Sequence, residues 1–450
     1  MGKQITHFLI IGLLLVLTLL NFILVFTPEI GFDALWYHLT LPRIFLESRS
    51  WFVPGGLLYY SVLPRLFETI SIPLIQFSGF IGPKLIQFLS GVLVNLMIYN
   101  LIVRRTGDKY LAIIGVSLFY GTWVVSWQSG SAYLDLFRTL LEFGAIYFYF
   151  STTGLKKIIL PSIFLGLALG TKHHALFSLF LFATFIDKRV IPIAVLLGLP
   201  WYLLSYHFTG NPVYPLFTIW MQDSQLQVMG EQFYQPLSLI FRLFTLPWHF
   251  TLPYDDFISP VLGLVFLLLL IQFIQKKSSD KLLAFSLVGM ITCFFLPPPS
   301  SRYLIPFIPG VVVSLVSHPF LSSNRFRQLF AIVATLSIFS IVGMRMIAMK
   351  KYLPYLLHQQ TQNEFLTSLS NRLPLTFIDS DGFVESLPKE ANYLIDKLHN
   401  LYYFPHHLNH TSWVGNTANF DYLITIGADP KNTPGQLIHT NQIGIQVFKL

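Results

Sequence analysis

Long apolar runs recur along the first 350 residues of this chain and leave few choices of fold. A helix needs about 20 mostly apolar residues to cross a bilayer, because its backbone N–H and C=O groups must be satisfied within the segment. The runs lie at residues 8–26, 85–103, 110–127, 136–150, 158–170, 175–185, 190–206, 260–274, 282–296, 303–316 and 329–348. They predict an all-α polytopic membrane protein of about 11 transmembrane helices. The first run lacks a small-residue cleavage site behind it, which indicates a retained span.

Charge is scarce and is placed as a membrane protein requires. Charged residues make up 11% of the chain and hydrophobic residues 54%, whereas a soluble domain carries roughly 25% charged residues. The net charge of +8 comes mostly from lysine and arginine in short loops between the runs. Topology and anionic membrane lipid account for such a pattern, and a nucleic-acid partner is not expected. The one cysteine, Cys293, falls within a predicted span, so the chain can form no internal disulfide.

The basic loops also set the predicted orientation. With the N-terminus inside, the inner loops at 104–109, 156–157, 188–189, 276–281 and 325–327 are all basic. This pattern requires 158–170 and 175–185 to be two short helices rather than one. Three long stretches, 27–84, 207–259 and 349–450, then fall on the outer side. We expect a cell-membrane (inner or plasma membrane) protein whose active site faces outward.

Two domains are predicted. Residues 1–348 form the transmembrane domain with outer loops 27–84 and 207–259, and residues 349–450 form a small α/β domain in the outer, periplasmic compartment. Within it, residues 375–379, 422–426 and 443–447 have the composition of short strands, and 390–399 that of a helix.

Two acids follow or precede predicted spans on the outer side. Asp33 comes just after the first span, where partial desolvation would raise its strength as a base. On an α-helix Tyr37 shares its face and His38 points away. Asp135 closes the short loop before the fourth span. Either acid could instead cap its helix, and Asp135 could pair with Arg138.

Other outer residues offer weaker signals. Glu68 is a third candidate acid, although a solvated helix face explains it more simply. Lys172 and Arg302 could neutralise a lipid phosphate, with Tyr303 against the prenyl chain, or the two cations could extend to the interface as snorkelling side chains. The adjacent histidines His173 and His174 lack the spacing that is typical of a metal site.

Five motifs, in order, resemble the GT-C-fold glycosyltransferases, in particular bacterial relatives of protein mannosyltransferases and aminoarabinose transferases. The motifs are Phe32-Asp33-Ala34-Leu35-Trp36-Tyr37-His38-Leu39, Ala132-Tyr133-Leu134-Asp135, the Gly-x-x-x-Gly-x-Lys of Gly166 to Lys172, Pro200-Trp201-Tyr202 followed by Thr209 to Pro215, and Arg302-Tyr303-Leu304-Ile305-Pro306. Each motif is weak alone, and together they cover roughly residues 1–350.

The resemblance implies an inverting glycosyltransferase that moves a sugar from a polyprenyl-phosphate donor to an envelope glycan, lipid or protein. It implies that Asp33 is the base or holds a divalent metal, that Asp135 orients the acceptor or shares that metal, and that Lys172 and Arg302 stabilise the leaving phosphate. Tyr37, His38 and Glu68 would support the acceptor or the metal. The lone acid at Asp33, where relatives carry an acidic pair, leaves the metal open.

Two other functions fit part of the sequence. A transporter or flippase of lipid-linked glycans would place ionisable residues at mid-membrane on broken helices, whereas here the acids lie near the outer surface. A polysaccharide polymerase or ligase would need several outward arginines close together, and this sequence meets that requirement poorly.

Overall fold

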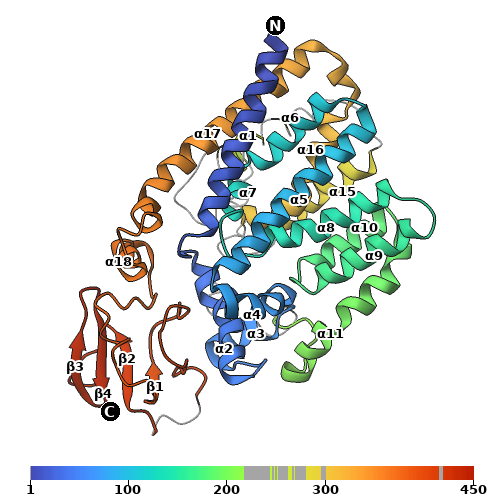
Figure 1. Ribbon diagram of the computed structural model, residues 1–450. Helices are drawn as coiled ribbons and strands as arrows, with labels where there is room; N and C mark the ends of the chain where they lie inside the picture. The colour runs from blue at the N-terminus through green and yellow to red at the C-terminus, as the bar shows by residue number, and fades with distance from the viewer. Residues whose placement is uncertain are drawn as a thin grey trace. The chain divides into compact units, whose positions relative to one another are not determined.

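The computed structural model describes residues 2–216, 280–294, 300–414 and 419–450, with a few single positions between 244 and 268 (Figure 1). Most of the predicted span at 260–274 and most of the stretch 207–259 lie outside the described residues. The chain forms two compact units. The helical unit comprises Met1–Val25, Leu85–Gly130 and Leu134–Ile347, and the sheet unit comprises Phe26–Lys84, Ser131–Tyr133 and Ala348–Leu450.

Four of the described helices are long and apolar enough to cross a membrane. They run over Ile5–Val25, Ile81–Thr106, Lys188–Thr209 and Asn324–Leu356, which correspond to α1 (Gly2–Val25), α5 (Ile81–Thr106), η3 with α11 (Lys188–Val190 and Ile191–Thr209) and α17 (Asn324–Leu356). Shorter apolar helices accompany them, among them α6 (Lys109–Tyr120), α10 (Ala175–Phe185) and α15 (Lys281–Phe294). The chain is a multi-pass membrane protein, and the total of about 11 crossings stays a prediction.

Several helix boundaries depart from the apolar pattern. The predicted helix at 110–127 is broken into α6 and α7 (Trp123–Gln128), because Thr122 takes an extended conformation after Gly121. The run at 303–316 opens as a 3₁₀ segment, η5 (Ser301–Phe307), before α16 (Ile308–Val316). Proline at 306 lacks the N–H that an α-helix would need there. The predicted break after 170 is present, since α9 (Lys156–Leu169) and α10 are separate helices.

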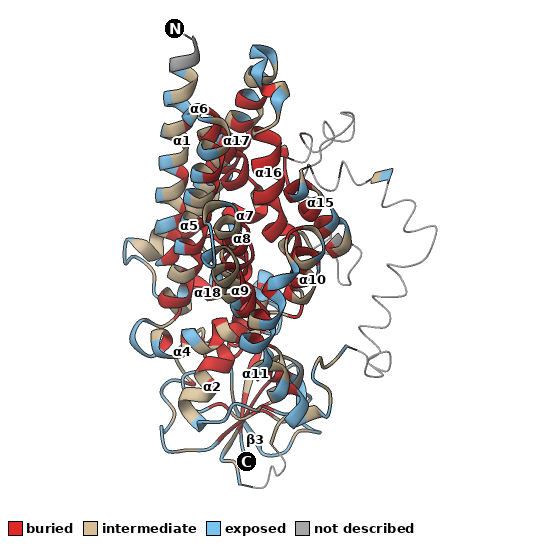
Figure 2. Cartoon of the chain, turned by 90° about the vertical axis from the view of Figure 1, so that its right-hand side faces the viewer, coloured by how far each residue is buried: buried red, intermediate tan, exposed pale blue. Residues whose placement is uncertain are grey.

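Close packing within the helical unit brings α8 (Asp135–Ser151) against α9, and α9 against α11. A Cβ at Gly144 would lie 2.4 Å from Phe164 Cδ1, so only glycine allows this approach of α8 to α9. The 3₁₀ segment η5 packs against both α8 and α15. Every residue of α16 is buried, as its red ribbon in Figure 2 shows.

A buried ion pair stabilises α8. Arg138 is fully buried and its Nε donates to Oε1 of Glu142 one turn later, while the Ser178 hydroxyl of α10 donates to Glu142 Oε2. The carboxylate thus has both a counter-charge and a hydroxyl partner, which an apolar setting demands.

Glu142→Gln should lower the melting temperature of the detergent-purified protein substantially. Removing one partner of a buried pair leaves an uncompensated charge and costs about 3–5 kcal/mol. Asp187→Asn is the matched control, because its partner Arg189 is exposed, and exposed pairs contribute little. Equal melting temperatures for the two variants would contradict the assigned role of Glu142.

The sheet unit contains a four-stranded sheet of order β1-β2-β4-β3. Strand β1 (Tyr393–Ile395) pairs parallel with β2 (Tyr422–Ile426), and β4 (Ile445–Lys449) pairs antiparallel with β2 and with β3 (Gln436–Thr440). Its hydrophobic core also includes residues from the first outer stretch. Leu41 and Ile44 of α2 (Thr40–Ser48) pack with Ile395, Ile424 and Val447 of the strands.

Two features of the tail were predicted wrongly and one was missed. Residues 390–399 contain strand β1 rather than a helix, because the buried run Tyr393 to Ile395 pairs along its backbone with β2. Residues 375–379 form only a single bridge, at Thr376. The missed strand β3 is mostly exposed and lacks the alternating pattern that reveals a strand. Strand β2 matches its predicted bounds, and β4 lies two residues further on than predicted.

Candidate active site

Residues from three distant segments of the helical unit meet around Tyr303. Lys172 Nζ, between α9 and α10, lies 4.6 Å from the centroid of the Tyr303 ring and 3.6 Å from Oδ1 of Asp135 at the start of α8. Arg302 Cζ lies 5.9 Å from the same ring, and the His174 ring lies 4.3 Å from it. We call Asp135, Lys172, Arg302 and Tyr303 the cationic cluster. All four were predicted site residues.

The electrostatics of this cluster are those of a partly dry site. Asp135 is 1% exposed, and within the described part of the chain neither carboxylate oxygen has a hydrogen-bond partner. A separation of 3.6 Å to Lys172 is an ion pair rather than a hydrogen bond. The Lys172 side chain is itself only 16% exposed. Attraction between charges is stronger in such surroundings than in water.

Neither simpler role proposed for Asp135 is observed. Asp135 is the first helical residue of α8, and Leu134 holds the capping position. Arg138, the alternative partner, binds Glu142 instead. Among the described residues, Lys172 is the cation within ion-pair distance of this carboxylate, and Arg138 adds a longer-range attraction.

The first outer motif lies in the sheet unit and forms a π-helix, η1 (Ala34–His38), rather than an α-helix. Leu39 N–H donates to Ala34 O at 2.9 Å, five residues back. Asp33 precedes the π-helix, is half-buried and does not cap it with its side chain. Tyr37 stacks on Tyr60, with centroids 3.9 Å apart.

His38 and Glu68 form a buried pair. His38 Nδ1 lies 2.5 Å from Glu68 Oε1, and the two residues are 1% and 5% exposed. The expectation of a solvated helix face for Glu68 was wrong, because α4 (Leu66–Ser78) packs this face against α2.

Glu29 is a residue that the sequence did not reveal. Its Oε1 accepts from the N–H groups of Ile30 and Gly31 at 2.9 and 2.7 Å, and its Oε2 accepts from Ala132 N–H at 2.5 Å. A Cβ on Gly31 would meet Tyr133 at 2.5 Å. Glu29 thus fixes the turn that carries Asp33 against residues 131–133. In the sequence, the only signal for Glu29 was its position close before Asp33.

A metal finds little support in these donors. No group of three or more His, Cys, Asp or Glu side chains suited to a metal occurs among the described residues. Asp135 already faces the ammonium of Lys172, which would repel a second cation. Asp33 belongs to the sheet unit and Asp135 to the helical unit.

No protein-family model and no curated protein matches this chain. Solved structures do match, among them two of ArnT. The crystal structure of ArnT from Cupriavidus metallidurans bound to undecaprenyl phosphate matches with a TM-score of 0.60 at 14% identity, over 100% of this chain and 98% of that one. The apo structure of the same ArnT gives 0.61 at 13% identity, over 97% of each chain.

This chain has an ArnT-like, GT-C-type fold. The resemblance predicted from the five motifs is therefore confirmed at the level of the fold. The match extends over the C-terminal part, where no motif was recognised.

Proposed function

We propose that this chain is a glycosyltransferase that transfers a sugar, with inversion, from a polyprenyl-phosphate donor to an envelope acceptor. The observation that carries the proposal is the cationic cluster, which gathers Lys172, Arg302 and Tyr303 around one buried acid on an ArnT-like fold. The ArnT structure that resembles this chain is bound to undecaprenyl phosphate. We further propose that the site faces outward from the cell membrane.

The reaction requires stabilisation of the charge that develops on the leaving lipid phosphate. The acceptor hydroxyl oxygen attacks the anomeric carbon while the bond from that carbon to the phosphate oxygen breaks. The electron pair of the broken bond leaves with the lipid phosphate, and Lys172 and Arg302 stabilise the charge that develops there. Tyr303, against which both cations lie, packs beside the first part of the prenyl chain.

The hydroxyl proton must go to a base, and Asp33 takes it in this proposal. Its half-buried carboxylate follows a turn that Glu29 holds rigid. Asp135 orients the ammonium of Lys172 through the 3.6 Å ion pair, and thereby helps to place the acceptor beside the donor. Tyr37 and the His38–Glu68 pair shape the acceptor side near Asp33. The acceptor is an envelope glycan, lipid or protein.

The test is transfer of radiolabelled sugar from synthetic polyprenyl-phosphate donors to envelope extracts by the purified protein. Label that moves from donor to acceptor supports the enzyme. Absence of transfer from a panel of donor sugars would contradict it. Movement of intact donor across a vesicle bilayer by the same preparation would favour a flippase.

Metal dependence is a separate prediction. The proposed steps use no metal, because the donors around Asp135 fit one poorly. If the reaction needs a divalent cation, EDTA should abolish transfer, and Mg²⁺ or Mn²⁺ should restore it. Transfer that survives EDTA would show that no divalent cation is needed.

A further inference from the structure

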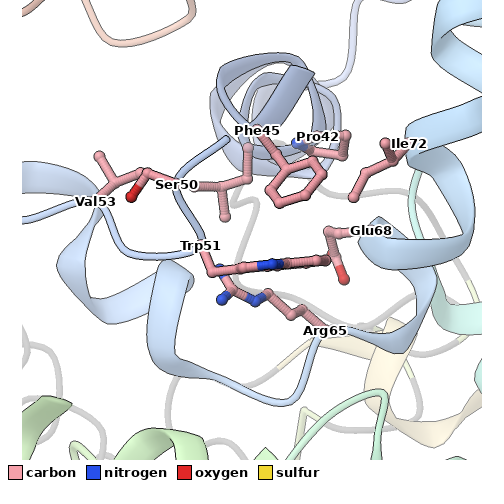
Figure 3. Close-up of a pocket in the computed structure, with 9 residues that line it drawn as sticks. Pro42, Phe45, Ser50, Trp51, Val53, Arg65, Glu68 and Ile72 are labelled. Carbon is pink, nitrogen blue, oxygen red and sulfur yellow. The ribbon is translucent and has the colours of Figure 1, made fainter. Parts of the chain in front are cut away.

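A pocket in the sheet unit lies between α2 and α4 (Figure 3), and Glu68, the partner of His38, is one of its lining residues. Its walls are mostly apolar and include Phe45 and Trp51. Two charged side chains, Arg65 and Glu68, also line it. Trp51 is 38% exposed, so the pocket has an opening beside this ring.

Arg65 is buried in the pocket, and part of its donor set is unpaired among the described residues. The residue is 4% exposed, and Nε and Nη2 have no hydrogen-bond partner among the described residues. Nε–H and one Nη2–H point the same way along one edge of the guanidinium group. This edge binds a carboxylate or phosphate through two parallel hydrogen bonds. A buried charged donor left unsatisfied is costly, and each such case requires an explanation.

The protein orients this guanidinium but does not neutralise it fully. Arg65 Cζ lies 5.0 Å from the Trp51 ring, whose other face contacts Phe45 with centroids 4.1 Å apart. Burial lowers the pKa of Arg65 to about 10, and attraction to Glu68 offsets only part of that effect. Glu68 itself contacts His38 at 2.5 Å. Arg65 thus remains charged at neutral pH, in a rigid aromatic setting.

We propose that Arg65 binds an oxyanion in this pocket, through Nε and Nη2, and that the oxyanion is a phosphate or carboxylate group of a substrate. Binding of the anion does not depend on the proposed glycosyl transfer; only its identity as part of a substrate rests on that function. Phe45, Trp51 and Ile72 line the pocket, so the pair would form in largely apolar surroundings.

Binding can be measured without catalysis. In the full-length Lys172→Gln/Arg302→Gln protein, which lacks the cations of the other cluster, inorganic phosphate should still show broadened ³¹P NMR lines that acetate reverses. Adding Arg65→Gln should remove most of the broadening, and Arg65→Lys, which keeps the charge without the fork, should restore only part. Undiminished broadening in the Arg65→Gln protein would overturn the proposal.

Thermal stability separates a binding residue from a structural one. Without ligand, Arg65→Met should melt at the same or a higher temperature, because a buried unpaired charge is removed. Phosphate should raise the melting temperature of the parent and not of Arg65→Met. A lower melting temperature in Arg65→Met that phosphate does not affect in either protein would make Arg65 a structural cation and overturn the site.

Steady-state kinetics of Arg65→Lys identifies the source of the anion. A raised KM for the donor with unchanged KM for the acceptor would assign the pocket to the lipid phosphate. The reverse result would assign it to an acidic acceptor. If both KM values are unchanged in an active enzyme, the oxyanion does not belong to a substrate, and that part of the proposal fails.

Discussion

Lys172→Met should reduce sugar transfer by about 10²–10³-fold, the usual loss when one preorganised donor to developing charge is removed. Lys172 Nζ lies over the Tyr303 ring and beside Asp135, where a leaving phosphate would gain most from a cation in a poorly hydrated site. The measurement is the rate of label transfer at saturating donor. Lys172→Arg, which keeps the charge, should retain part of the activity.

A second variant tests why Lys172→Met loses activity. The loss could come from the missing cation at the phosphate or from the Asp135 carboxylate left without its counter-charge. Lys172→Met leaves the buried Asp135 carboxylate without its counter-charge, so lost activity could reflect local misfolding. The double variant Lys172→Met/Asp135→Asn removes both charges. If Lys172 acts on the donor, the double variant stays as inactive as the single one. Recovery of transfer in the double variant would contradict that role.

Lys157→Met is the matched control. Lys157 also lies over an aromatic ring, with Nζ 4.4 Å from the centroid of Tyr149, but it stands in the first turn of α9, at a position predicted on the inner side. Both variants lose a lysine–aromatic contact of the same kind. Transfer by Lys157→Met should therefore remain near the wild-type rate, and an equal loss in both would point to a general effect of removing lysine.

Local sequence patterns predicted much of the fold, because an element that is buried along its length carries apolar residues in a regular pattern. The apolar runs located the long helices, and composition located β2 at its observed bounds. The same reasoning failed where burial comes from both faces, as at β1 within 390–399, or where an edge strand is exposed, as at β3. Composition cannot distinguish these cases from a helix or a loop.

Sequence patterns likewise identified some residues of the candidate site and missed others. Asp135, Lys172 and Tyr303 were identified from motifs, and the structure brings them together. Glu29 and Arg65 were missed because their roles depend on partners or pockets far along the chain. Glu29 reaches the amide of residue 132, and Arg65 contacts Trp51 across a turn. No spacing rule in a sequence encodes such contacts.

Asp33→Asn should lower the rate of transfer by about 10²–10⁴-fold, the range typical for loss of a positioned base. The amide keeps the size and shape of the side chain but cannot accept the hydroxyl proton. The loss should fall on kcat, with little change in KM for donor or acceptor, because a base acts in the transition state rather than in ground-state binding.

Asp381→Asn makes the same change elsewhere in the sheet unit and serves as the control, since Asp381 pairs with His439 at the surface. It should transfer sugar at the wild-type rate, with both variants expressed and melting alike. A raised KM for the acceptor at unchanged kcat would make Asp33 a binding residue. Transfer undiminished by Asp33→Asn would exclude it from the chemistry. Because the Asp33 turn is held by Glu29 independently of the Asp33 side chain, a lost rate can be attributed to the carboxylate and not to a collapsed loop.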